Sequence, residues 1–345
     1  MKRVPDFNSD YMEGAHPLIL NRLIETNKEK TSGYGTDPYS ERARARIREV
    51  CCAPNAGVHF LVGGTQTNAT VLSALLAPYE GVISADSGHI ATHEAGAIEA
   101  TGHKVITAPA KDGKLTAEAA LGILRAYAED EVREHTVKPG ALYVSHPTEY
   151  GTLYTCAELA ELSRIAHDYG ARLYLDGARL GYALASDGSD LTLPDIAELC
   201  DVFYIGGTKC GALFGEAVVF PDPNLLPHFF TVIKQHGALL AKGRIAGIQF
   251  DTLFDGNLYT EICRKGIDSA MYLKKELSAR GYSFYLDSQT NQQFPIVSCE
   301  KYEELKTAGV GFNTWEHLPD GRVVIRFVTS FMTEREEVDG LLAYM

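Results

Sequence analysis

A single lysine lies in a glycine turn that carries no other charge. Lys209 follows an apolar run in the segment FYIGGTKCGALFG (203–215). A lysine amine can form a Schiff base with an aldehyde, and the glycines beside it would let a bulky group approach the backbone. The amine is therefore a candidate reacting group, although a solvated surface lysine is an alternative reading of the same turn.

An aspartate and an arginine follow a second apolar run. Asp176 comes directly after RLYL (172–175), and Arg179 lies three residues further along. A carboxylate at the end of a buried strand is partly desolvated, so it requires a cation or a hydrogen-bond donor. Arg179 could pair with it structurally or bind the anionic group of a ligand, and the spacing alone leaves both readings open.

Glycines also follow a third apolar run, in FLVGGTQTN (60–68). Gly63, Gly64 and Thr65 precede a predicted helix, whose first N–H groups and positive dipole end would favour a phosphate. The segment lacks the lysine of a P-loop and the spacing of a dinucleotide fingerprint. A plain strand–helix turn therefore remains possible, and His89, after another short strand, could be a packing histidine.

Together these residues indicate one cofactor. A phosphate site, a strand-end aspartate and a lysine 33 positions after that aspartate fit pyridoxal 5′-phosphate. The lysine would hold the cofactor's aldehyde, and the carboxylate would keep the pyridine nitrogen protonated, so that the ring becomes an electron sink.

These side chains require elements that bring their strand ends together. Short apolar strands alternate with helical stretches, and a capping box at Thr155 and Glu158 marks one helix start. We expect an α/β fold with a mostly parallel sheet of seven strands and helices on both faces, with the ligand outside the carboxyl ends of the strands. The expected strands are 58–64, 82–86, 104–109, 141–147, 172–177, 201–207 and 216–221, and the expected helices include 65–79, 91–101 and 155–170.

The pattern changes after about residue 225. A long helical stretch, 259–282, is followed by short alternating strands, which indicates a smaller α+β domain. We predict an N-terminal arm with one helix over 1–45, a large cofactor-binding domain over 46–245, and a small C-terminal domain over 246–345.

Composition excludes several classes of partner. The 345 residues carry 45 acidic and 32 basic side chains, a net charge of −13, so no nucleic-acid or membrane partner is expected. Seven scattered cysteines without a CxxC pair indicate reduced thiols, and no apolar leader or span is evident, so we expect a cytoplasmic protein. His89 and His93 have no third ligand nearby in sequence, and we predict no metal site.

The sequence resembles the low-specificity L-threonine aldolase and β-eliminating lyase branch of the aspartate-aminotransferase-like pyridoxal-phosphate enzymes. The similar segments follow the family's order along nearly the whole chain, and LDGARL with the later lysine is the most specific pair. They are FNSD (7–10), SGYGTDP (32–38), FLVGGTQTN (60–68), HIATHEAGA (89–97), YLDGARLG (174–181), GGTK (206–209) and IRFVTSF (325–331).

The resemblance implies roles for the cofactor site. Lys209 would bind the cofactor covalently, Asp176 would pair with its ring nitrogen, and His89 would stack on the ring and act on the substrate hydroxyl. The residues implied to bind the cofactor are Gly64, Thr65, His89, Asp176, Arg179, Thr208 and Lys209.

The resemblance also implies a substrate site. Arg326, Arg179 and Ser9 would hold the α-carboxylate of an amino acid, a task suited to arginine. Tyr34 would line the substrate pocket, reaching it across a subunit interface, and Lys242 would approach a neighbouring subunit's phosphate. We therefore expect a homodimer or homotetramer with shared active sites.

The implied reaction is cleavage of an L-3-hydroxy amino acid, of the L-threonine or L-allo-threonine type, to glycine and an aldehyde. Glu149 stands near the place where relatives carry a second histidine, while His146 comes earlier and His93 replaces a common aromatic residue. The base for the substrate hydroxyl is therefore open between His89, water and another group. β-Elimination of another amino acid, and ligand binding without turnover, remain alternatives.

Overall fold

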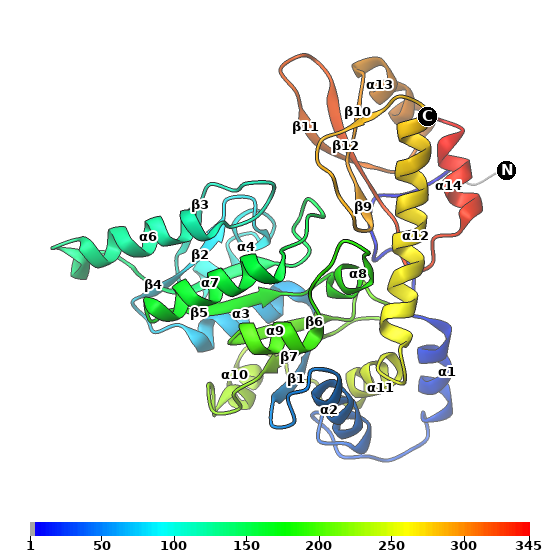
Figure 1. The fold of residues 1–345 in the computed structure, drawn as a ribbon. Coiled ribbons are helices and arrows are strands. Elements are labelled where there is room, and N and C mark those ends of the chain that lie inside the picture. Colours follow the sequence, from blue (N-terminus) through cyan, green and yellow to red (C-terminus); the bar gives the residue numbers. More distant parts are fainter. Residues whose placement is uncertain (1–3) are drawn as a thin grey trace.

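The computed structural model describes residues 4–345. A large domain is built on a seven-stranded sheet, and a smaller sheet forms a second lobe beside it (Figure 1). The strand order of the large sheet is β1-β7-β6-β5-β4-β2-β3, and β7 is antiparallel to both of its neighbours. The mostly parallel α/β sheet expected from the sequence is confirmed.

The observed strands lie within about three residues of the expected ranges. The strands of the large sheet are β1 (Gly57–Leu61), β2 (Glu80–Ala85), β3 (Val105–Ala108), β4 (Lys138–Ser145), β5 (Arg172–Asp176), β6 (Val202–Gly206) and β7 (Glu216–Phe220). Those of the small domain are β8 (Ser283–Phe284), β9 (Gln292–Gln293), β10 (Pro295–Val297), β11 (Asn313–His317) and β12 (Val323–Val328).

Helices cover both faces of the large sheet (Figure 1). They are α2 (Pro38–Val50), α3 (Gly64–Leu75), α4 (His89–Thr92), α5 (Ala97–Ala100), α6 (Ala117–Glu129), α7 (Cys156–Asp168), α8 (Leu180–Ala185), α9 (Leu193–Leu199), α10 (Phe229–Gln235) and α11 (Arg244–Leu253). The remaining helices are α1 (Pro17–Glu25), η1 (Arg133–His135), α12 (Leu258–Ala279), α13 (Cys299–Ala308) and α14 (Arg335–Leu342).

Successive side chains on each strand enter different cores, because a strand alternates its faces with a period of two. In β5, Leu173 and Leu175 join the core beneath α6, α7 and α9, whereas Tyr174 joins the core beneath α3 and α10. Asp176 follows with the parity of Tyr174. The strand's own alternation therefore directs this carboxylate to the α3 side of the sheet.

The carboxyl ends of the parallel strands meet at one edge, where the catalytic candidates were expected. Because β7 runs antiparallel, its first residue, Glu216, lies at that same edge, paired with Gly206 of β6 and Leu61 of β1. The antiparallel direction of β7 thus brings to this edge a carboxylate that begins a strand, and a search of strand ends alone does not find it.

Helix α12 links the two domains. Its first half packs into the large-domain core through Tyr259 and Ile262, and its second half packs into the small-domain core through Leu273 and Leu277. The boundaries predicted at 45/46 and 245/246 fall inside α2 and α11. Packing therefore changes from one core to the other along α12.

Two local expectations were wrong. The helix expected over 91–101 is divided into α4 and α5, because Ala95 and Gly96 have positive φ angles of 51° and 74°. The arm contains a second helix, α2, capped by the Asp37 carboxylate.

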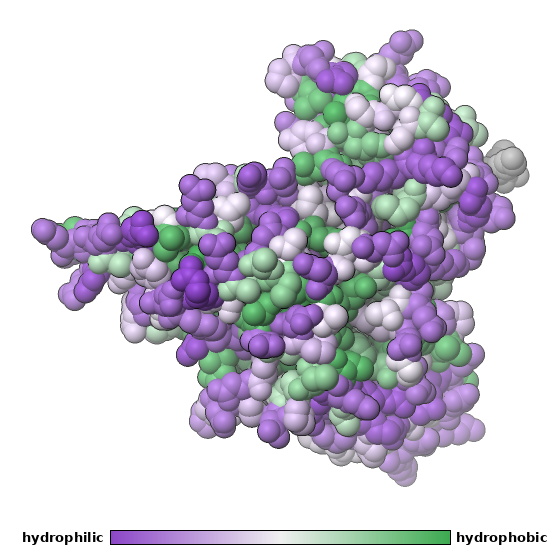
Figure 2. Space-filling view, viewed as in Figure 1, coloured by the Kyte–Doolittle hydropathy of each residue, from purple (hydrophilic) through white to green (hydrophobic). Residues whose placement is uncertain are grey.

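Figure 2 shows hydrophilic residues over most of the outer surface, with hydrophobic residues gathered over the middle of the large domain. None of the helices in residues 4–345 is long and apolar enough to cross a membrane.

Candidate active site

A cavity of about 260 Å³ lies at the carboxyl edge of the large sheet. The structure brings together there the predicted residues Gly64, Thr65, His89, Asp176, Arg179, Thr208 and Lys209. They come from four different strand-end connections, those after β1, β2, β5 and β6, so the cavity exists only once the sheet has formed. Tyr11, Ser145, Glu149, Tyr204 and Glu216 also line it.

The glycine turn forms one end of the cavity. Helix α3 begins at Gly64, and the preceding Gly63 offers no side-chain cap within the described chain, so the first N–H groups of the helix remain available to a ligand. A Cβ at Gly63 would meet no atom within 4 Å, whereas one at Gly64 would lie 3.2 Å from the Tyr204 hydroxyl. The turn therefore has the free donors that a phosphate requires.

The backbone of Lys209 is held by a hydrogen bond, and the residue lines the cavity. Its carbonyl accepts a hydrogen bond from the Tyr182 hydroxyl at 3.0 Å, and its Nζ lies 6.0 Å from the centre of the Tyr11 ring. Burial and the nearby Arg179 lower the pKa of Lys209, although Asp10 among other acids opposes the shift. A lowered pKa increases the neutral, nucleophilic fraction of the amine.

Asp176 is buried and accepts four hydrogen bonds. Its Oδ2 accepts from the Tyr143 hydroxyl at 2.6 Å and from the Asn68 amide at 3.0 Å. Its Oδ1 accepts from the Tyr204 hydroxyl at 2.5 Å and from the Ala178 N–H at 3.0 Å. Burial alone would raise the pKa of Asp176, but the nearby His89 and these donors lower it below the ordinary value. The carboxylate therefore stays ionised and can pair with a pyridinium nitrogen.

Sequence reasoning missed the tyrosines around Asp176. The Tyr143 and Tyr204 hydroxyls donate to Asp176, and the Tyr174 hydroxyl donates to Asn68. Tyr143, Tyr174 and Tyr204 occupy the third or sixth position of three neighbouring strands and belong to the same core. A buried tyrosine needs a partner for its hydroxyl. Tyrosine in an otherwise apolar run of a strand was the available signal, and it indicated a polar site at the strand ends.

His89 belongs to a closed circuit of hydrogen bonds beside Asp176. Its Nδ1 lies 2.8 Å from Glu94 Oε1, and its backbone N–H donates to Glu149 Oε1 at 2.8 Å. Asn68 connects Glu94 to Asp176, donating to Glu94 at 2.7 Å. Both carboxylates position His89, so the ring orientation is fixed before a ligand arrives.

Arg179 is paired with a residue that sequence reasoning did not single out. Its Nε and Nη2 donate to the two oxygens of Asp10 at 2.7 and 3.0 Å, and Asn291 donates to the same carboxylate at 2.8 Å. Burial would raise the pKa of Asp10, but Arg179 lowers it. The forked pair neutralises most of Arg179 and leaves its remaining nitrogen for a ligand.

Arg326, on β12, has a different environment. Its guanidinium donates to the neutral side-chain oxygens of Asn313, at 2.6 Å, and Gln292, at 3.0 Å. It lies 5.0 Å from the centre of the Trp315 ring. Burial and Arg179 lower the pKa of Arg326 to about 10. In residues 4–345 no acidic side chain forms an ion pair with it, so its charge is available for an anionic ligand.

The residues present fit pyridoxal phosphate. The glycine turn supplies free N–H groups, Asp176 is held ionised, and Lys209 presents an amine whose pKa is lowered. The Ser9 hydroxyl is buried, and no hydrogen-bond partner for it lies within 4–345. An orphaned donor beside Asp10 and Arg179 suits a bound carboxylate.

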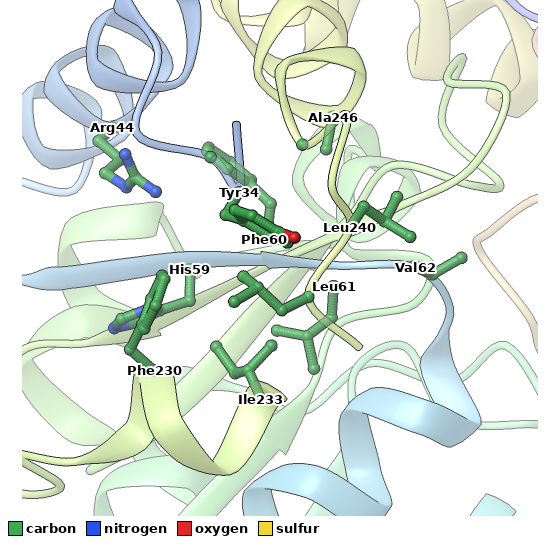
Figure 3. Close-up of a pocket in the computed structure, with 13 residues that line it drawn as sticks. Tyr34, Arg44, His59, Phe60, Leu61, Val62, Phe230, Ile233, Leu240 and Ala246 are labelled. Carbon is green, nitrogen blue, oxygen red and sulfur yellow. The ribbon is translucent and has the colours of Figure 1, made fainter. Parts of the chain in front are cut away.

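Tyr34 lies away from this cavity within its own chain. Figure 3 shows it in a separate small hollow with Phe60 and Leu240. Its ring is 43% exposed, and Lys234 Nζ lies 4.5 Å from the ring centre. Lys242 is also exposed, and it directly precedes Gly243, which lines the same hollow. An approach to the substrate by either residue would have to be toward another copy of the chain.

The histidines near the expected second position separate in space. His146 is fully buried, its Nδ1 accepts from the Tyr154 N–H at 3.3 Å, and burial lowers its pKa to about 4. His93 is exposed, with its ring centre 5.7 Å from that of His89 and 6.5 Å from that of Trp315. Glu149, rather than His146, therefore faces the cavity.

Comparison with known proteins gives consistent matches. Residues 6–294 match the model of the family described as beta-eliminating lyase. A low specificity L-threonine aldolase from Pseudomonas aeruginosa is 29% identical over 97% of this chain and 95% of its own. The solved structure of Leishmania major threonine aldolase is 43% identical, covers 98% of both chains and has a TM-score of 0.94. An aspartate aminotransferase from Thermus thermophilus, 17% identical, covers 100% of this chain and 96% of its own at a TM-score of 0.73, which shows a shared fold.

Proposed function

This chain belongs to the β-eliminating lyase family, and we propose that it is a pyridoxal 5′-phosphate-dependent aldolase that cleaves L-threonine or L-allo-threonine to glycine and acetaldehyde. One observation carries the proposal. Lys209, the ionised Asp176 and the free N–H groups after Gly63 converge on a single cavity. When bound there, the cofactor would withdraw the electron pair that carbon–carbon cleavage leaves at Cα.

We assign the substrate carboxylate to Arg326. Its uncompensated charge supports this assignment, because within residues 4–345 its acceptors are the neutral Asn313 and Gln292, whereas Arg179 is already paired with Asp10. Arg179 and Ser9 would contribute single hydrogen bonds beside it. Fixing the carboxylate orients the bonds at Cα and so selects which one breaks.

We propose that Glu149 is the base that accepts the proton of the substrate's β-hydroxyl group. Its Oε1 is held by the His89 N–H and by the Ser145 hydroxyl at 2.6 Å, and within the described chain Oε2 receives no hydrogen bond. Burial raises the pKa of Glu149, which makes the carboxylate a stronger proton acceptor once it is ionised. Glu149 would take the hydroxyl proton while the Cα–Cβ bond breaks and the aldehyde forms.

Glu149→Gln tests this assignment. The variant should lose cleavage by about 100-fold or more. It should retain exchange of the glycine Cα proton with deuterated solvent, followed by NMR, because that exchange involves no β-hydroxyl. Equal losses of cleavage and exchange would make Glu149 a structural residue.

We further propose that two copies of the chain share each active site, with Tyr34 supplied by the partner. The exposure of Tyr34 and its distance from its own chain's cavity support this. Tyr34→Phe would then leave the dimer intact by light scattering while raising KM. Monomeric protein with full activity would exclude shared sites.

The reaction itself is tested by product analysis. With added pyridoxal phosphate, L-threonine and L-allo-threonine should each be supplied in parallel, and the release of glycine and acetaldehyde measured. Their release establishes the aldolase, and the ratio of rates gives the stereochemical preference. Ammonia and a keto acid instead would identify the β-eliminating activity and contradict the aldolase proposal.

A further inference from the structure

We propose that Glu216 is part of the phosphate site as a neutral carboxyl group, and that binding of the cofactor's phosphate holds a proton on it. The inference rests on the proposed cofactor but on none of the substrate chemistry. Glu216 has no role in the mechanism above, and no strand-end motif in the sequence marks it.

Strand pairing places Glu216 between the two turns that a phosphate would contact. On one side it is paired with Leu61, just before the Gly63–Thr65 turn, and on the other with Gly206, just before Thr208. It lines the same cavity as these residues and is only 3% exposed. A phosphate held by the glycine turn would therefore lie beside this carboxyl group.

The hydrogen bonds of Glu216 tie it to a predicted phosphate ligand. Its Oε2 accepts from the Gly207 N–H at 3.1 Å, and its Oε1 accepts from the Thr208 hydroxyl at 2.8 Å. The Thr208 hydroxyl itself accepts from the Gly215 N–H at 3.0 Å. While Glu216 is ionised, the single Thr208 proton is thus directed to the carboxylate and is unavailable to a phosphate.

No cation in residues 4–345 forms an ion pair with Glu216. The charged and titratable groups that face it are Lys209, Asp176, Tyr174, Tyr204 and Tyr259. Burial raises the pKa of Glu216 to about 8, although Thr208, Lys209 and Gly207 oppose the shift. This shift favours the neutral form at neutral pH even before a ligand binds.

A bound phosphate would strengthen that preference. The second pKa of a phosphate monoester is about 6, so above neutral pH the group is a dianion. Two adjacent anions in a buried site repel strongly, whereas a neutral Glu216 can donate to Thr208 and turn the hydroxyl proton toward the phosphate. Raising the pH above the pKa of Glu216 should therefore weaken phosphate binding.

The test compares pyridoxal phosphate with pyridoxal in the full-length protein. Pyridoxal has the same aldehyde and ring and lacks only the phosphate, so any pH dependence that arises at Lys209 is common to both. Dissociation constants should be measured by absorbance from pH 7 to 9. The preference for the phosphorylated ligand should fall by roughly tenfold over that range in the natural sequence.

Glu216→Gln supplies the matched variant. A glutamine can accept from Gly207 and donate to Thr208, which is the pattern of the neutral carboxyl group. The variant should bind pyridoxal phosphate at pH 7 within about threefold of the natural protein, and its preference should be constant up to pH 9. Glu149→Gln, at the other end of the cavity, should keep the tenfold fall.

A second readout needs no ligand. Because the pKa of Glu216 is raised on folding, its burial costs stability as pH rises from its unfolded pKa toward 8. The apo Glu216→Gln protein should therefore melt at a higher temperature than the natural protein at pH 8, and the difference should disappear near pH 4.5.

The outcomes are distinct. A pH-independent preference in the natural protein, or the same fall in Glu216→Gln, would overturn the inference while leaving the aldolase proposal intact. Absence of glycine release together with the expected pH dependence would overturn the aldolase proposal alone. Absence of binding by either ligand would overturn both.

Discussion

Asp176 and Glu216 are two buried carboxyl groups in one cavity whose pKa values are shifted in opposite directions. Asp176 receives four hydrogen bonds and has a lowered pKa, whereas Glu216 receives two and has a pKa raised to about 8. Both are nearly excluded from water, at 3% exposure each. Burial alone therefore does not set the charge of a carboxyl group here, because the nearby His89 and the larger number of donors favour an ionised Asp176.

The difference matches the two ends of the proposed cofactor. A pyridinium nitrogen needs a negative partner, and a phosphate needs neutral or positive ones. Tyrosines from β4 and β6 supply two of the donors at the Asp176 end, while Glu216 has a backbone N–H and one hydroxyl. The same sheet edge thus provides an anionic end and a neutral end a short distance apart.

The largest effect is expected at Lys209, which interacts with both carboxyl groups. Lys209→Ala should lower kcat/KM for threonine cleavage by at least about 1,000-fold, because the variant has no amine to hold the aldehyde. Steady-state assays with saturating cofactor measure the loss. Near-normal turnover in this variant would contradict the proposal that Lys209 holds the cofactor between Asp176 and Glu216.

Replacing each carboxyl group in turn by its amide tests the comparison. Asp176→Asn should lower kcat/KM about 100- to 1,000-fold at pH 7, since the charge at the ring nitrogen is lost. Glu216→Gln should change kcat/KM by less than about threefold under the same conditions. Similar losses in both variants would show that the two groups carry the same charge.

The two arginines also differ: Arg179 is paired with Asp10, and Arg326 has no acidic partner in the described part of the chain. Arg326→Ala should raise KM for threonine by roughly 10- to 100-fold, because a charge-assisted pair with the substrate carboxylate is lost. Arg326→Lys is the matched control, which keeps the charge and loses the fork, and should recover part of the affinity. An unchanged KM in Arg326→Ala would contradict this role and would indicate that Arg179 binds the substrate carboxylate instead.

A smaller effect tests the donors themselves. Tyr204→Phe removes one hydroxyl from Asp176 and should raise the pKa of that carboxyl group. Since Asp176 acts as the ionised form, activity lost on acidification should then be lost at higher pH than in the natural protein. At pH 7 the rate should fall only about 3- to 10-fold. A pH profile that coincides with that of the natural protein would mean that Tyr204 does not support the charge.

The fold and the first contacts of the cavity followed from local sequence. Asp176 and Lys209 each follow an apolar strand, and the carboxyl ends of parallel strands lie at one edge of a sheet. The sequence therefore predicts that these two residues lie near each other. The same reasoning failed for Glu216, which begins a strand, and only the antiparallel direction of β7 brings it to that edge. Asp10 escaped notice as well, since its pairing with Arg179 joins residues 169 positions apart.

The role of Tyr34 rests on the family resemblance, which places it in a substrate pocket across a subunit interface. The structure puts it in a separate hollow of its own chain (Figure 3), and its place beside a substrate stays a prediction. A role that depends on a second subunit leaves no signal in spacing or periodicity. The domain boundary predicted at 245/246 stays a prediction, and α12 is one continuous helix whose buried face passes from one core to the other.

The most direct test of the proposed site is to identify the residue that holds the cofactor. The protein should be incubated with pyridoxal phosphate, reduced with borohydride, digested and analysed by mass spectrometry. We predict one phosphopyridoxyl group on the peptide containing Lys209, and its absence from that peptide in Lys209→Ala. Stoichiometric labelling of a different lysine, or no labelling of the natural protein, would contradict it.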